Sequence, residues 1–161
     1  MKAILIADSE GQDWGEDSER NDMSLIKTGQ EIEIMRVAGA IAAEVLELLA
    51  VFVRPGVTTR QVDEFAAEQM KKRGAKSAFL GYRKFPCHLC LSVNDEVVHG
   101  LANDRQLRFG DIVSVDCGVM YKNLIGDTAT TLAVGGCGVA AQRLMDVTQQ
   151  ALAQGVAQAV A

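Results

Sequence analysis

Two aspartates eleven residues apart, Asp116 and Asp127, are the strongest candidates for chemistry in this chain of 161 residues. They lie in the stretch 110–135, which predicts two strands joined by a tight turn. Apolar and polar residues alternate along the first strand, as expected for a sheet with one packed face. With the turn centred on Tyr121-Lys122, the two aspartates face each other directly across the strands, with Cβ atoms roughly 4.5–5.5 Å apart.

Two like charges in that position destabilise a sheet unless something balances them. A divalent cation is the simplest partner, because carboxylate oxygens suit Mn, Mg, Ca or Fe. Two adjacent carboxylates can also bridge two ions about 3.5–4 Å apart. The alternative is that one aspartate faces solvent or accepts a hydrogen bond from a neighbouring threonine. The hairpin by itself leaves both interpretations open.

Two helices are predicted before this hairpin. Each begins at a capping box, in which a threonine is followed three residues later by Glu or Gln. The two boxes are Thr28 with Glu31 and Thr58 with Gln61. The first helix is expected to end at 54–56, Arg-Pro-Gly, and the second at Gly74. Both carry an apolar stripe at three- and four-residue steps, which is typical of helices that cover a core.

Short strands and a final helix account for most of the remaining chain. Strands are expected over 77–80, 89–93 and 97–98, and a helical pattern follows Gly136. That pattern continues to Ala161, so the chain is expected to end inside a helix. The apolar side of the first hairpin strand should pack against the helices; it is formed by Val113, Val115, Cys117 and Val119.

Composition indicates one globular domain with a core, since 48% of the residues are hydrophobic. The net charge of −5 comes from residues 1–22, which hold seven acids against Lys2 and Arg20. We expect 1–22 to be a flexible acidic extension and 23–161 to be the domain. The apolar run 3–7 is shorter than a secretory signal, and no stretch reaches membrane-spanning length. A basic stripe that would indicate nucleic-acid binding is also missing.

The chain has four cysteines, at positions 87, 90, 117 and 137, which fit a reducing compartment better than a disulfide framework. This usage favours a cytoplasmic protein. Cys87 and Cys90 have the spacing of half a structural zinc site, although no second pair of this kind follows. Free thiols in or near the core are the alternative.

A longer motif resembles a known family. The run 92–100, SVNDEVVHG, is followed by GDIVSVD at 110–116 and GDT at 126–128. Together these segments closely resemble the type I methionine aminopeptidases, and the resemblance extends over roughly 26–161. It implies an α+β pita-bread fold, with helices on one face of an antiparallel sheet. In that fold two pseudo-symmetric halves share the sheet, and this chain corresponds to the first half.

The resemblance also implies roles for individual residues. Asp116 resembles the carboxylate that chelates one metal ion, and Asp127 the one that bridges two. His99 resembles the histidine that contacts the substrate and hydrogen-bonds the scissile amide. Tyr82, Phe85 and Cys90 resemble part of the pocket for the methionine side chain, since aromatic rings suit a thioether. A loop histidine with only structural contacts, and ordinary core packing of Cys90, are the alternatives.

The activity implied is removal of the N-terminal methionine from newly made proteins by metal-assisted hydrolysis. The full family site holds two divalent ions (Co, Mn, Fe, Zn or Ni), and the substrates are peptides or nascent proteins beginning with Met. The other ligands in the family are one His and two Glu. The only histidines here are His88 and His99, and no Glu follows Glu96. We therefore expect an incomplete ligand set and an inactive chain.

The alternative function is a non-catalytic half-domain that binds peptide N-termini or a protein partner. Half of a sheet leaves one strand edge without a neighbour, and such edges pair with other chains. Self-association through that edge is therefore a further expectation.

Overall fold

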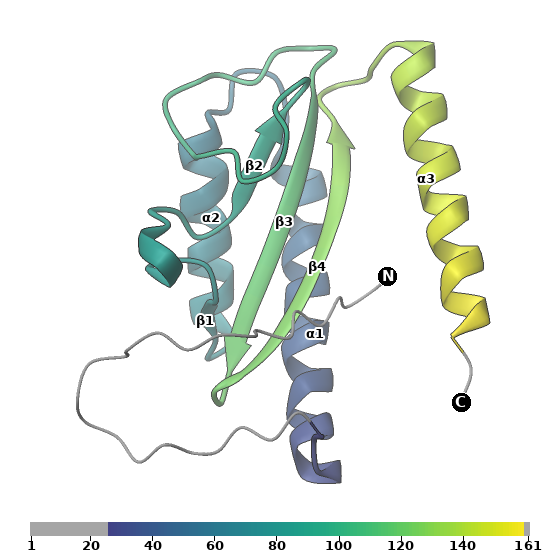
Figure 1. Cartoon of the computed structure of the whole chain (residues 1–161). Coiled ribbons are helices and arrows are strands. Elements are labelled where there is room, and N and C mark those ends of the chain that lie inside the picture. Colours follow the sequence, from purple (N-terminus) through teal and green to yellow (C-terminus); the bar gives the residue numbers. More distant parts are fainter. Residues whose placement is uncertain (1–25, 160–161) are drawn as a thin grey trace.

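The computed structural model describes residues 26–159, so the acidic extension predicted over 1–22 lies outside the described residues. Within them, helices α1 (Gly29–Phe52) and α2 (Thr59–Lys72) cover the same face of one antiparallel sheet (Figure 1). This is the two-layer α+β arrangement expected from the sequence. The face of the sheet away from α1 and α2 is the one that carries the two aspartates.

Both helices begin at their predicted capping boxes. The Thr28 hydroxyl accepts a hydrogen bond from the Glu31 N–H at 3.3 Å, and the Glu31 carboxylate accepts one from the Thr28 N–H at 2.7 Å. Thr58 and Gln61 repeat this exchange at 3.2 and 2.9 Å. The capping boxes thus mark both helix starts in the sequence. In α2 the N–H groups of Thr59 and Arg60 also donate to the carbonyl oxygens of Arg105 and Asn103, at 3.1 and 2.9 Å, so tertiary contacts help to fix that start.

Strand β3 (Ile112–Tyr121) is the centre of the sheet. Strand β4 (Leu124–Ala133) pairs with it along its whole length. On the other edge of β3, the short strands β1 (Lys76–Ser77) and β2 (Cys90–Val93) pair with its two ends. Since β3 has neighbours on both sides, its polar face lies in the middle of the sheet, between β4 on one side and β1 and β2 on the other.

The turn between β3 and β4 is not where the sequence analysis centred it. It consists of Lys122 and Asn123, both with positive φ (47° and 63°), as a two-residue type I′ hairpin requires. The prediction of Tyr121-Lys122 was therefore wrong. It would have placed a bulky aromatic residue in a left-handed conformation, which costs more than placing Asn there. The strand register is shifted by two residues as a result.

The core lies between the sheet and the two helices, as predicted. Val113, Val115 and Val119 are at most 1% exposed and belong to the main apolar cluster. Helix α1 lies directly on β4 at Gly126, where a Cβ atom would be 2.3 Å from the backbone nitrogen of Gly39. Only a residue without a side chain allows that approach.

One predicted strand, over 77–80, is shorter than expected, and another, over 97–98, does not form. The strand predicted over 77–80 ends at Ser77, whose hydroxyl accepts hydrogen bonds from the N–H groups of Phe79 and Leu80 and so turns the chain. The pair Val97-Val98 forms no strand and is 84% and 69% exposed. A positive φ of 29° at Val98 breaks the extended conformation there.

The final helix, α3 (Val139–Gln158), stands clear of α1 and α2 in Figure 1, and none of its residues is buried. Its apolar residues remain open to solvent: Val139, Leu144, Val147 and Val156. Of the helices in residues 26–159, none is both long and apolar enough to cross a membrane.

Candidate metal centre and substrate pocket

Asp116 and Asp127 lie on the same face of adjacent antiparallel strands. Asp127 stands opposite Gly118, and Asp116 opposite Ala129, so the two aspartates are diagonal neighbours rather than the directly opposed pair that was predicted. A register shift of two residues preserves the face, whereas a shift of one would have reversed it. The two carboxyl groups reach each other and form a hydrogen bond.

The electrostatics of this pair favour a proton between its members. Burial raises the pKa of both carboxyl groups, and the charge of Asp116 raises that of Asp127 further. The backbone N–H groups of Cys117 and Thr128 act in the opposite direction but are weaker. Without a cation, the pair therefore retains one shared proton at pH values where an exposed carboxyl group has lost its own.

The donor set fits a hard divalent cation as two of its ligands. Carboxylate oxygens are the donors that such ions prefer, and a cation would replace the shared proton. Within residues 26–159, no group of three or more His, Cys, Asp or Glu side chains is arranged to hold a metal ion. The described part of the chain thus supplies the carboxyl pair and no third ligand of these types.

Cys90 lies beside the carboxyl pair, because it is opposite Asp116 on the neighbouring strand β2. Burial, followed by the charges of Asp116 and Asp127, raises the pKa of the Cys90 thiol to about 12. Without a cation, the thiol therefore stays protonated at neutral pH. Its position fits the predicted role of lining a pocket next to the carboxyl pair.

Phe79 also lies on the face of the sheet that carries the carboxyl pair, and the sequence analysis did not single it out. Its ring covers Gly118, where an added Cβ atom would come within 2.3 Å of it. Phe85, which was predicted to line the pocket, meets Phe79 edge to face, with ring centroids 6.4 Å apart and an interplanar angle of 87°. The signal for Phe79 was Gly118 itself, a residue without a side chain on the polar face of β3, which leaves room for a ring.

Tyr82 lies in the short 3₁₀ helix η1 (Tyr82–Lys84), at the tip of the loop that also carries Phe79 and Phe85. Its side chain is 37% exposed, and the Arg83 guanidinium lies 5.4 Å from the centre of its ring. The loop thus contributes three aromatic residues: Phe79 covers Gly118, and Phe85 packs against the Phe79 ring.

His99 lies in the loop after β2, with an exposed side chain and a φ of 55°. The adjacent Gly100 fixes the position of this loop. Its carbonyl accepts a hydrogen bond from the Leu91 N–H at 2.9 Å, and its own N–H donates to the Ser92 hydroxyl at 3.2 Å. Through these bonds Gly100 lies beside β2, the strand that pairs with β3, and His99 is the residue before it.

The zinc interpretation of Cys87 and Cys90 gains no support. All four cysteines are free thiols, and Cys87 lines a cavity of 340 Å³ beside α2 whereas Cys90 lies beside Asp116. A second cavity, of 400 Å³, lies between the end of α1 and α2. Neither cavity is lined by the carboxyl pair, so both are separate from the candidate metal centre.

Comparison with known proteins places this geometry in a family. Residues 33–161 match metallopeptidase family M24. The chain is 42% identical over 137 residues to the methionine aminopeptidase of Clostridium perfringens, covering 85% of this chain and 55% of that protein. The chain therefore spans about half the length of the curated relatives it matches.

Solved structures agree in fold. The methionine aminopeptidase of Thermotoga maritima has a TM-score of 0.78 and 41% identity, covering 82% of this chain and 53% of that one. The enzyme of Rickettsia prowazekii has a TM-score of 0.78 and 36% identity, covering 83% and 54%. The fold is thus the pita-bread fold of these enzymes over about half its length. The chain belongs to metallopeptidase family M24.

Proposed function

We propose that this chain contributes half of the active site of a methionine aminopeptidase, which removes the N-terminal methionine from newly made proteins. The observation that carries the proposal is the hydrogen-bonded pair of Asp116 and Asp127 on one face of the sheet. The pair occurs in a chain 42% identical to a methionine aminopeptidase. The non-catalytic alternative is not favoured, because the matching relatives bear the name of the enzyme.

In this proposal Asp116 and Asp127 hold divalent ions drawn from Co, Mn, Fe, Zn or Ni. When bound, such ions polarise a peptide carbonyl and lower the pKa of a water molecule. The two carboxyl groups must release their shared proton first, which makes metal binding favour higher pH. The absence of a side chain at Gly118 leaves room for the Phe79 ring on the face that carries the pair.

The substrate in this proposal is a peptide or nascent protein beginning with Met. Phe79, Tyr82, Phe85 and Cys90 surround its thioether, for which aromatic edges and a protonated thiol are suitable contacts. His99, exposed at the edge of β2, donates a hydrogen bond to the scissile amide and supports departure of the new amine. The exposure of His99 leaves it free to meet such a substrate.

Metal binding provides the direct test. Titration of the chain with Mn²⁺, followed by paramagnetic broadening of amide NMR signals, should broaden signals of β3 and β4 around the carboxyl pair. Asp116→Asn and Asp127→Asn should each abolish the effect, and Asp95→Asn, which removes an exposed carboxylate from a turn, should leave it unchanged. Broadening that persists in both site variants would show that the carboxyl pair is not the metal centre.

The environment of the chain is also part of this proposal. Four free thiols support a cytoplasmic location. Among the described residues β4 pairs only with β3, so its outer edge is available for another strand, and we propose self-association there.

A further inference from the structure

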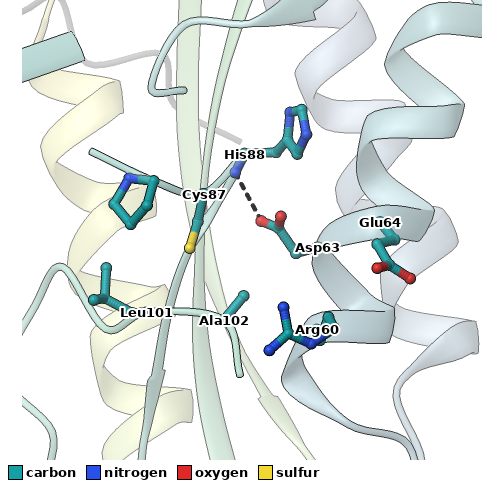
Figure 2. A pocket seen from close by; sticks show the side chains of 8 residues that line it. Arg60, Asp63, Glu64, Cys87, His88, Leu101 and Ala102 are labelled. Atoms are coloured by element: carbon teal, nitrogen blue, oxygen red, sulfur yellow. Dashed lines mark hydrogen bonds between the residues drawn. The ribbon is translucent and has the colours of Figure 1, made fainter. Parts of the chain in front are cut away.

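Two side chains outside the candidate site, Asp63 and Ser77, form hydrogen bonds with the backbone of His88. Asp63 bonds to its N–H group, and Ser77 bonds to its carbonyl oxygen. Asp63 Oδ1 accepts hydrogen bonds from the N–H groups of His88 at 2.9 Å and Leu89 at 2.8 Å, and the first is drawn as a dashed line in Figure 2. The Ser77 hydroxyl donates to the carbonyl oxygen of His88 at 2.8 Å. Side chains from α2 and β1 therefore fix the end of the loop 79–88, which carries Phe79, Tyr82 and Phe85 and is called the aromatic loop below.

The Ser77 hydroxyl fixes the beginning of the same loop as well. It accepts hydrogen bonds from the N–H groups of Phe79 at 3.0 Å and Leu80 at 3.1 Å. One hydroxyl thus joins residues 79 and 80 to residue 88 and uses both its donor and its acceptor capacity. The loop between them cannot shift without breaking these bonds.

The tip of the loop is closed on itself. Gly81 and Phe85 are joined by a backbone hydrogen bond of 2.9 Å, and Phe85 N–H donates to Tyr82 at 2.8 Å. Three residues of the tip have left-handed φ values: 86° at Gly81, 45° at Arg83 and 67° at Lys84. Because the tip is an internally bonded unit, its position over the sheet depends on how its two ends are attached.

Asp63 is an unusual residue for its location, which indicates a specific role. It is 7% exposed, on the buried side of α2, and it borders the 340 Å³ cavity together with Cys87 and Arg60 (Figure 2). Burial raises the pKa of its carboxyl group, and the two N–H groups that donate hydrogen bonds to it act against that rise. Burying a carboxylate costs free energy unless it is hydrogen-bonded, and here the N–H groups of His88 and Leu89 supply those bonds.

We propose that Asp63 and Ser77 are positioning residues for the methionine-side-chain pocket. By fixing the His88 backbone they place Phe79 over Gly118 and Phe85 against the edge of the Phe79 ring. Neither residue touches the substrate. The inference rests on the proposed function, because that function makes this aromatic pair the wall of a substrate pocket.

The test compares disruptive and conservative variants of both residues. Asp63→Ala and Ser77→Ala remove the hydrogen-bonding atoms, whereas Asp63→Asn keeps Oδ1 and Ser77→Thr keeps the hydroxyl. Glu64→Ala removes the neighbouring exposed carboxylate, and Val45→Ala weakens the core elsewhere. The measurements are the nuclear Overhauser effect between the Phe79 ring and the Gly118 α-protons, and the amide exchange rates of His88 and Leu89.

We expect both alanine variants to lose the contact between Phe79 and Gly118. In Asp63→Ala the exchange rates at His88 and Leu89 should rise about tenfold, as expected for loss of one net hydrogen bond. The contact should remain in the two conservative variants, Asp63→Asn and Ser77→Thr. It should also remain in Glu64→Ala and Val45→Ala. Alanine variants that keep it, or a Val45→Ala variant that loses it to the same extent, would overturn the proposal. If Asp63→Ala does not fold, the comparison of Ser77→Ala with Ser77→Thr decides whether the proposal holds.

A second measurement separates this inference from the proposed function. L-Methionine is titrated into each variant, and shifts of the Phe79 and Phe85 ring signals give its affinity. We expect affinity to fall about tenfold in the alanine variants, since the pocket wall is displaced by lost hydrogen bonds. If L-methionine does not bind the unmodified chain, the pocket assignment fails, whereas the contact between Phe79 and Gly118 still decides whether Asp63 and Ser77 position the loop.

Discussion

Gly118 stands opposite Asp127 across the β3–β4 ladder, so the carboxyl group of Asp116, two residues earlier in β3, reaches Asp127 along the diagonal. Phe79 fills the space that a side chain at position 118 would take. The carboxyl pair and the aromatic wall are thus adjacent because one residue between them is a glycine.

The first prediction concerns how much the carboxyl pair lowers the free energy of unfolding. Asp127→Asn should stabilise the metal-free chain at pH 7.5 by about 1 kcal/mol, a value reduced for solvent screening at this half-buried pair. The variant removes one of two buried acids whose pKa values are raised by burial and mutual repulsion. Urea unfolding in the presence of a metal chelator measures the change.

The same pair predicts a pH dependence with a definite sign. A carboxyl pKa that is higher in the folded chain means that folding favours the protonated form, so the contribution to stability is present at low pH and is lost as pH rises. Between about pH 4, the ordinary carboxyl value, and neutral pH, the unmodified chain should lose more stability than Asp127→Asn. Equal losses in the two chains would contradict the raised pKa values.

The second prediction concerns catalysis by the 161 residues alone. We expect no release of methionine from a Met-Ala-Ser peptide in the presence of Mn²⁺ or Co²⁺, because the described residues contain no third metal ligand beside the carboxyl pair. The assay is detection of free methionine by chromatography. Release that is abolished in Asp127→Ala would show that the two carboxylates suffice.

The third prediction tests the contact between α1 and β4. Gly126→Ala should destabilise the chain by about 1–3 kcal/mol or more, because its Cβ atom would meet the α1 backbone at 2.3 Å and backbone cannot give way as a side chain can. Gly29→Ala, where no atom lies within 4 Å, is the matched control and should not destabilise. Thermal unfolding compares the two variants directly.

The sequence predicted the face of the two aspartates but not their register. Alternation along β3 and the small size of the turn fix which residues share a face, and a shift of two positions leaves that unchanged. The register depends on which residues accept positive φ. Lys122 gives no local signal for that conformation, whereas Asn123 does, because Asn tolerates positive φ. That signal and the cost of placing Tyr121 in the turn both favour the observed register.

For the proposed pocket, too, the sequence identified some residues and missed others. Phe85 and Cys90 were identified through the family resemblance, whereas Phe79 fell within the strand predicted over 77–80. What ends that strand is the Ser77 hydroxyl, which accepts from two following N–H groups. Serine forms such turns in some contexts and sits in strands in others, so sequence alone could not decide.

The fourth prediction tests the turn itself. Asn123→Val should destabilise the hairpin by about 1–2 kcal/mol, because a β-branched residue at a φ of 63° is strained where Asn is tolerated. Lys122→Asn should leave stability unchanged or raise it, since Asn suits the first position of a type I′ turn. Urea midpoints of the two variants provide the measurement, and equal effects would argue against the type I′ assignment.

The fifth prediction addresses self-association. Ile125→Lys adds a charge to an exposed position of β4, which is 44% accessible, and should lower the dimer fraction because lysine on an edge strand discourages pairing. Val97→Lys, at a position that is 84% exposed in the loop before His99, is the control. Sedimentation velocity at several concentrations measures the dimer fraction, and a monomeric unmodified chain would refute association through β4.

The two-residue turn at Lys122-Asn123 also bears on the order of folding. It brings Asp116 and Asp127 together through a loop of minimal length, and hairpins of this kind form in roughly 1–10 μs, before contacts between distant segments. The loop that carries Phe79 and Phe85 must instead wait for α2 to supply Asp63. We therefore expect the two acids to meet early, while the chain is still largely hydrated, and to become desolvated only when the aromatic loop closes beside them.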